Sequence, residues 1–246
     1  DDKYKWPKNS FFQAENVEIR KNLAWFQLSP LLTDTGWVFD DDISYMVDLD
    51  SIWVKNGGIV VCLENGKVFL DWVLKQTIST GTSNHNRIIG IWYNRDSLWT
   101  ERVYYVTKTS SWAGKIHRST TDLATWDISH RSFTTSSLSS PKCTVLSSGW
   151  VIYIFINDRI FYMENIEVVQ EYCAIASTEE IIFAFEYGKF YRIYANRGSV
   201  GIEYTWDWFS QAPLTREEFY WKPFLGWAND WAYAYMITGF NSSYAS

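Results

Sequence analysis

Residues 114–127 read GKIHRSTTDLATWD, and the opening of this stretch recurs along the chain in altered form. Gly114 is followed by a basic residue, an apolar residue and a histidine. Related copies stand at 66–69 (GKVF), 158–162 (DRIFY) and 188–191 (GKFY), each of them after an alternating apolar run. Gly, Asn and Asp tolerate the positive φ that a two-residue hairpin turn requires. The pattern therefore predicts a β-hairpin that is repeated four times.

The rest of the chain has the same character. Short runs of β-branched and aromatic residues, such as RVYYVT (102–107) and WAYAYMI (231–237), are separated by Gly, Asn, Asp and Ser, and helical periodicity is almost absent. The predicted turns are 48, 44 and 30 residues apart, and their mean spacing is close to the ~40–50 residues of a four-stranded propeller blade. The sequence predicts an all-β protein, a β-propeller with five blades of antiparallel strands. A β-sandwich and a β-rich fibre module are the alternatives.

We expect a single domain over residues 1–246. The expected blades cover residues 48–80, 87–130, 143–170, 173–210 and 217–240. Residues 1–47 are expected to supply a closing strand to the last blade or to decorate one face. Closure matters because an unpaired strand edge invites aggregation.

A local motif follows the hairpin copy at Gly114. Thr120-x-Asp122-Leu123-x-x-Trp126 resembles the Asp-box-like turn of β-propeller proteins, in the form seen in five-bladed glycosidase-type propellers. Within such a turn Asp122 can accept backbone N–H bonds, Thr120 can bond across the turn, and Trp126 can fold over the hairpin. The resemblance covers seven residues of one blade. It implies a structural turn that lies away from an active site.

Composition narrows the function classes. The chain has 15 Trp, 16 Tyr and 15 Phe, and its net charge is −6. It contains no polybasic run, so we expect no nucleic-acid partner. Its longest apolar stretches are far shorter than a membrane span, so we expect no membrane insertion. Cys62, Cys143 and Cys173 form no metal-binding spacing, and we expect buried free thiols, no metal and no cofactor.

Carbohydrate recognition is the expected function. Sugar rings stack on Trp and Tyr while their hydroxyls bind polar side chains. Two stretches combine both residue types. The candidate ligand-binding residues are Trp92, Asn94, Arg95, Asp96, Trp206, Asp207 and Trp208. The sequence thus predicts a lectin-like propeller that binds glycans or polysaccharide at an extracellular, cell or virion surface.

Two alternatives stay open. The first is a glycoside hydrolase, which needs two carboxyl groups with separated pKa values; the candidates are Asp50, Asp96 and Glu186. Asp50 and the neighbouring Asp48 are expected just before a strand SIWV at 51–54. The second is a module for protein interaction or structural assembly, with a protein partner in a larger complex.

Overall fold

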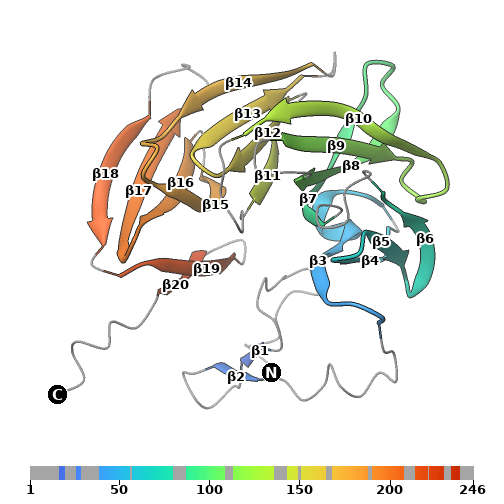
Figure 1. The fold of residues 1–246 in the computed structure, drawn as a ribbon, viewed down its shortest axis with the longest axis horizontal. Coiled ribbons are helices and arrows are strands. Elements are labelled where there is room, and N and C mark those ends of the chain that lie inside the picture. Colours follow the sequence, from blue (N-terminus) through green and yellow to red (C-terminus); the bar gives the residue numbers. More distant parts are fainter. Residues whose placement is uncertain are drawn as a thin grey trace.

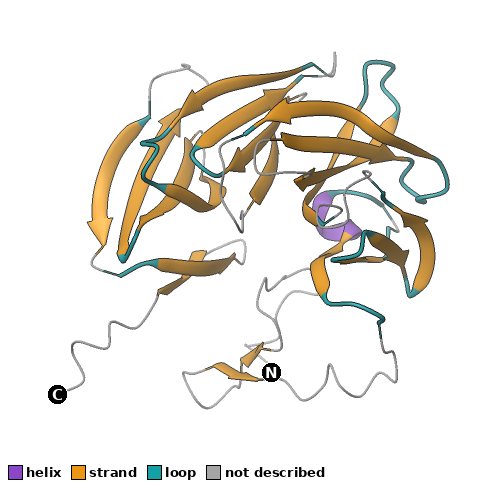
Figure 2. Cartoon of the chain, in the orientation of Figure 1, coloured by secondary structure: helices purple, strands orange, loops and turns teal. Residues whose placement is uncertain are grey.

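The computed structural model describes most of the chain from residue 39 onward. The described residues are 17–19, 26–28, 39–55, 57–79, 87–108, 113–135, 143–148, 151–164, 168–187, 190–207, 214–220, 222–229 and 234–238. Strands dominate them, and the only helical element within these ranges is the 3₁₀ turn η2 (Leu49–Ile52) (Figure 2).

Four antiparallel sheets of four strands follow one another along the chain, and a two-stranded sheet comes last. Blade 1 consists of β3 (Ile43–Asp48), β4 (Ile59–Leu63), β5 (Lys67–Leu70) and β6 (Val73–Thr77). Blade 2 consists of β7 (Ile88–Arg95), β8 (Glu101–Lys108), β9 (Ala113–Ser119) and β10 (Trp126–Thr134). Blade 3 consists of β11 (Cys143–Ser148), β12 (Val151–Ile156), β13 (Arg159–Met163) and β14 (Val169–Ala174). Blade 4 consists of β15 (Glu180–Tyr187), β16 (Phe190–Arg197), β17 (Val200–Asp207) and β18 (Thr215–Tyr220), and blade 5 of β19 (Phe224–Asn229) and β20 (Ala234–Thr238).

The blades lie side by side along an arc. Figure 1 shows β3, β7, β11, β15 and β19 on its inner side, and the first strands of successive blades contact one another. Within each four-stranded blade the strands succeed one another outward in chain order. This architecture is a β-propeller with five blades, which confirms the predicted fold class.

Apolar side chains fill the seams between blades. One buried cluster joins blades 1 and 2 around Tyr105, a second joins blades 2 and 3 around Ile154, and a third joins blades 3 and 4 around Trp206. Blades 2, 3 and 4 are covered on both faces, which explains why their inner strands read as nearly continuous apolar runs.

Each blade has two distinct ends. The turns between second and third strands bond to the segment that enters the next blade: Ile181 N–H donates to the Asn157 carbonyl at 2.6 Å, and Phe224 N–H donates to Asn196 Oδ1 at 2.7 Å. The inner strands therefore all start at that end. Connections after the first and third strands share the opposite end, which we call the loop face.

The observed blade boundaries differ from the expected ones because two kinds of hairpin look alike in sequence. Gly66 and Asn157 lie between second and third strands, whereas residues 188–189 connect the first and second strands of blade 4. The equivalent turn of blade 4 is at Gly198, which like Gly66 and Asn157 has a positive φ, here 58°. Gly114 lies inside β9 rather than at a turn. As a result β3 belongs to blade 1 rather than to the 1–47 segment, and β14 and β18 extend blades 3 and 4 to residues 174 and 220.

The N-terminal strands stand apart. β1 (Val17–Ile19) pairs with β2 (Phe26–Leu28), and neither pairs with another strand of the described part of the chain. That the first 47 residues close the last blade stays a prediction.

Candidate functional site

The loop face of blades 1 and 2 carries three large exposed apolar side chains. Trp53 follows η2 after the inner strand of blade 1 and is 80% exposed. Leu98 and Trp99 lie in the β7–β8 loop of blade 2 and are 81% and 55% exposed. We call Trp53, Leu98 and Trp99 the tryptophan face. Large apolar side chains exposed on the loops of one face can form a binding surface.

Both tryptophans have a backbone conformation that bulky residues avoid. Trp53 ends η2 with φ 76° and ψ 11°, and Trp99 has φ 64°. Trp72, at the β5–β6 turn of the same face, has φ 70°. The left-handed region costs a residue with a Cβ about 1–2 kcal/mol, and glycine occupies it without that cost. The chain thus holds three indoles at positions where the backbone conformation favours glycine.

Local hydrogen bonds fix the loop of Trp53. The Asp48 side chain accepts the Asp50 N–H at 3.0 Å and so caps η2, and Trp53 N–H donates to the Asp50 carbonyl at 3.3 Å. Asp50 Oδ1 accepts the Gly57 N–H at 3.0 Å, which closes the loop. The expected strand SIWV is therefore wrong: these residues form the end of a capped 3₁₀ turn, because the aspartates bond to the backbone locally.

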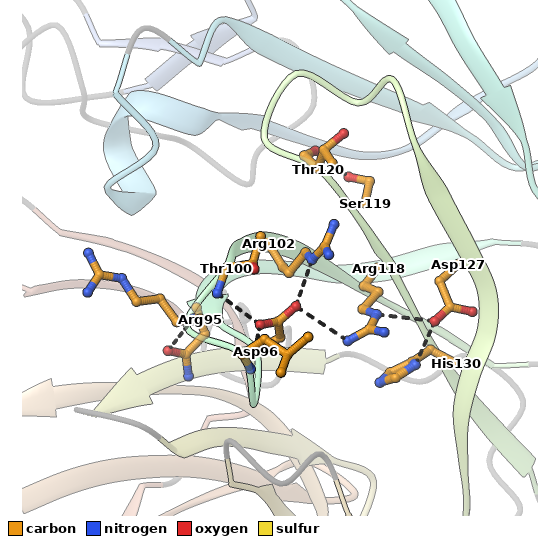
Figure 3. A network of polar contacts seen from close by, with 11 residues as sticks. Arg95, Asp96, Thr100, Arg102, Arg118, Ser119, Thr120, Asp127 and His130 are labelled. Atoms are coloured by element: carbon orange, nitrogen blue, oxygen red, sulfur yellow. Dashed lines mark hydrogen bonds and ion pairs between the residues drawn. The ribbon is translucent and has the colours of Figure 1, made fainter.

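Asp96 organises the loop of Trp99. Its buried carboxylate accepts the backbone N–H groups of Leu98 and Thr100, both at 2.9 Å, and the Arg102 Nε at 3.0 Å (Figure 3). Burial acts to raise the pKa of Asp96, but the Thr100 N–H, the Arg102 guanidinium and the Leu98 N–H outweigh it and hold the pKa below its usual value. The carboxylate stays ionised and its hydrogen-bonding capacity is used within the loop.

The network continues outward across blade 2. Arg118 on β9 lies 3.9 Å from Asp96 and donates through Nε to Asp127 on β10 at 3.1 Å, and His130 Nδ1 lies 2.8 Å from the same Asp127 oxygen (Figure 3). Positive and negative charges alternate along this line. The network therefore links the Trp99 loop to the outer strand of blade 2.

The first group of sequence-predicted ligand residues lies beside this face. Arg95 and Glu101 form an exposed pair at 3.5 Å where β7 ends and β8 begins. Asn94 is buried and accepts the Arg95 N–H at 2.8 Å, so it shapes the strand end. Trp92 is half-buried and packs against the apolar clusters of three seams, so most of its ring serves the core.

The second group does not join the first. Trp206 is only 1% exposed and lies between blades 3 and 4, with Tyr172 at 4.6 Å and Tyr153 at 5.0 Å between ring centroids. Its ring offers no face to a ligand, and we leave it out of the candidate site. Asp207 is half-buried at the end of β17, and Trp208 lies outside the described residues.

The turn at Thr120 is held by its own side chains. Asp122 Oδ1 accepts the Thr120 hydroxyl at 2.5 Å and the Ala124 N–H at 3.1 Å, while Thr120 Oγ1 accepts the Thr125 N–H at 3.1 Å. The Thr120 hydroxyl and the Ala124 N–H lower the pKa of Asp122. Trp126 donates to the Leu123 carbonyl at 2.8 Å and its ring packs on Tyr105. These contacts join β9 to β10, and the family resemblance of the motif stays a prediction.

The three candidate catalytic acids all follow or end inner strands, but their surroundings differ. Asp50 and Asp96 bond to the backbone of their own loops. Glu186 near the end of β15 is exposed to solvent over part of its surface, and desolvation of the covered part raises its pKa. The described residues contain no group of three or more His, Cys, Asp or Glu that could hold a metal ion. None of the described helices is long and apolar enough to span a membrane.

Sequence reasoning missed Trp53. The signal was present in the order Asp48, Asp50, Trp53, Gly57: acids that can cap a turn, followed by a glycine that closes the loop. The alternation of SIWV concealed it, because a four-residue apolar run fits a strand equally well.

No protein-family model and no curated protein matches the chain. Among solved structures it is similar to the β-propeller domain of Nup133 from Vanderwaltozyma polyspora, at 12% identity and a TM-score of 0.43, over 83% of this chain and 70% of that one. It is also similar to a structure from a study of two prolyl endopeptidases, at 7% identity and a TM-score of 0.37, over 77% of this chain. The chain spans about a third of that second structure, 32%.

Proposed function

We propose that this β-propeller binds surface carbohydrate and that the tryptophan face is its ligand site. The observation that carries the proposal is the pair Trp53 and Trp99, exposed on the loops of adjacent blades in a backbone conformation that favours glycine. Unfavourable backbone conformations persist where the surrounding structure enforces them, and they concentrate at binding sites.

The neighbouring groups suit a sugar ligand. Indole rings stack on the C–H faces of pyranose rings, and charged or amide side chains bind the hydroxyls. Arg95 and Glu101 stand next to the Trp99 loop as an exposed ion pair, which contributes little to stability. Both side chains can exchange this pairing for ligand hydroxyls at small cost.

Rigidity supports the same function. The Asp96 carboxylate ties the Trp99 loop to β8, and the Asp50 carboxylate closes the Trp53 loop. Rings held in place before binding lose little conformational freedom when a ligand arrives. We place the protein at an extracellular, cell or virion surface, where such glycans occur.

Hydrolysis is less favoured. A glycosidase needs one carboxyl group whose pKa is raised enough to protonate the leaving oxygen. Asp96 has the opposite shift, and its oxygens are occupied by backbone and arginine donors. The pKa of Glu186 is shifted in the required direction, but Glu186 lies on blade 4, whereas the Asp96 network belongs to blade 2.

The test is a panel of bacterial and eukaryotic surface polysaccharides, scored for retention of the protein and for new reducing ends. We expect retention without cleavage, and loss of retention in Trp53→Ala combined with Trp99→Ala. Val73→Ala, at an exposed position on β6, is the matched control. New reducing ends would favour the hydrolase. Equal retention of wild type and the double variant would refute the site, and no retention by any glycan would favour a protein partner.

A further inference from the structure

Arg102 on β8 is held at one edge of its guanidinium group and leaves the other edge unused. Its Nε donates to the buried Asp96 carboxylate at 3.0 Å, and its side chain is 22% exposed. Its terminal amino groups, Nη1 and Nη2, bond to no residue in the described part of the chain. A guanidinium group anchored through Nε can still bind a planar anion with its Nη1–Nη2 edge.

Other arginines use their terminal amino groups for contacts within the protein. Arg192 donates through Nη1 to Glu203 at 2.8 Å, and Arg216 donates through Nη2 to Glu179 at 2.8 Å. A terminal amino group also approaches a carboxylate or carbonyl oxygen in Arg87, Arg95, Arg118, Arg131 and Arg159. Arg102 differs from these residues because its outer edge is available to a ligand.

The charges next to Arg102 favour an anion. Arg118 Nη1 lies 3.9 Å from the Asp96 oxygen that accepts the Arg102 Nε, so two guanidinium groups share one buried carboxylate (Figure 3). Asp127 accepts the Arg118 Nε at 3.1 Å and pairs with His130, farther out on β10. Positive charge therefore exceeds negative charge beside the Arg102 side chain itself.

Asp96 connects Arg102 to the tryptophan face. One oxygen of its carboxylate accepts the Arg102 Nε, and the other accepts the backbone N–H groups of Leu98 and Thr100. Trp99 lies between these two residues, and its own N–H donates to the Asp96 carbonyl at 2.9 Å. The exposed indole and the guanidinium group are thus attached to the same buried residue, and both are positioned before a ligand arrives.

We propose that Arg102 binds an oxyanion carried by the sugar ligand, so that the tryptophan face recognises acidic glycans, in which sugars carry a carboxylate or a sulfate ester. This inference rests on the proposed carbohydrate function and narrows its ligand class. The planar guanidinium edge matches such an anion with two parallel hydrogen bonds. Because Asp96 already holds the guanidinium group, its side chain loses little conformational freedom on binding.

Titration calorimetry of the full chain with two pairs of polymers tests the inference. Polygalacturonate is compared with its carboxyl-reduced form, and dextran sulfate with dextran, so the two pairs distinguish a carboxylate from a sulfate ester. We expect wild type to bind the acidic member of at least one pair about tenfold more tightly than the neutral member, as two charged hydrogen bonds allow.

Two variants and a control examine the role of Arg102. Arg102→Gln should reduce the acidic preference to less than about twofold, because the charge is lost. Arg102→Lys retains a charge that can pair with Asp96 but lacks the planar edge, so it should lose at least about half of the preference. Arg87→Gln is the matched control, since Arg87 precedes β7 at the opposite end of blade 2, and it should keep the wild-type preference.

The possible failures are distinguishable. Equal affinity of wild type for the acidic and neutral members of both pairs would overturn the inference and leave the carbohydrate function standing. An acidic preference that survives in Arg102→Gln would place the anion site elsewhere. If Arg102→Gln loses all binding because the Trp99 loop unfolds, a wild-type preference in Arg102→Lys would overturn the inference. No binding of any polymer, here or in the wider polysaccharide panel, would refute the carbohydrate function itself.

Discussion

Tryptophan side chains are buried in one region of this propeller and exposed in another. At the seam of blades 3 and 4, Trp206 is enclosed by Tyr153, Tyr172 and Tyr191 with ring centroids 4.6 to 5.4 Å away. On the tryptophan face, Trp53 and Trp99 are exposed, and their backbone has the left-handed conformation that is unfavourable for bulky residues. The seam residue stabilises the fold through burial, whereas the face residues adopt a backbone conformation that is unfavourable for a residue with a Cβ. A high aromatic content therefore has two physical causes in one chain.

The largest expected effect belongs to the seam. Trp206→Ala should lower the free energy of unfolding by about 3–5 kcal/mol, because it removes a fully buried ring and leaves a cavity. Urea denaturation measures this, with Trp53→Ala as the control on the face. We expect the control to change stability by less than about 1 kcal/mol. Equal losses in the two variants would contradict the comparison.

A buried histidine in the interior makes the stability of the protein depend on pH. His117 is fully buried; the Ser129 N–H donates to Nδ1 at 2.9 Å, so the proton is on Nε2, 2.8 Å from the Thr107 hydroxyl. Desolvation, with Lys115 nearby, lowers the pKa of His117 to about 4. The unfolded chain, with a pKa of about 6.5, binds this proton first, so stability falls as pH drops from about 6.5 toward 4.

The expected loss from His117 is about 3 kcal/mol between pH 7 and pH 4. Denaturation of wild type and His117→Gln across that range isolates it, since the variant lacks this titration while all other groups titrate in both. The difference in unfolding free energy between the two proteins should shrink toward pH 4. A difference that stays constant with pH would show that the buried imidazole does not titrate as described.

The Asp96 loop connects interior and face. Asp96→Asn should cost about 2 kcal/mol, because charged hydrogen bonds to Arg102 and two backbone N–H groups are weakened in a buried site. Asp127→Asn, on the exposed side of the same network, should cost less than about 1 kcal/mol. Thermal unfolding compares the two. A larger loss at Asp127 would mean that the outer part of the network, not the loop, carries the stability.

The sequence could supply the fold class because alternation and turn chemistry are local properties. It could not show which strand begins each blade. A turn after a first strand and a turn after a second strand use the same types of residue, as 188–189 and Gly66 illustrate. Arg95 and Asp96 were predicted from their polar–aromatic surroundings, and they lie beside and within the Trp99 loop; their part in ligand binding stays a prediction. Trp53 was missed, and Trp206 was predicted to bind a ligand although it is buried between two blades. The exposure of a side chain depends on how neighbouring blades pack, and composition does not reveal that packing.

The most direct measurement is the affinity of a retained glycan for Trp53→Gly combined with Trp99→Gly, by titration calorimetry beside thermal unfolding. Glycine relieves the left-handed backbone, but it also raises the entropy of the unfolded chain and removes the covered part of each ring, so each substitution should change stability by less than about 1 kcal/mol. We expect a double variant that folds with a stability close to that of wild type and binds the glycan at least a hundredfold more weakly. Wild-type affinity in a folded double variant would contradict the proposed site.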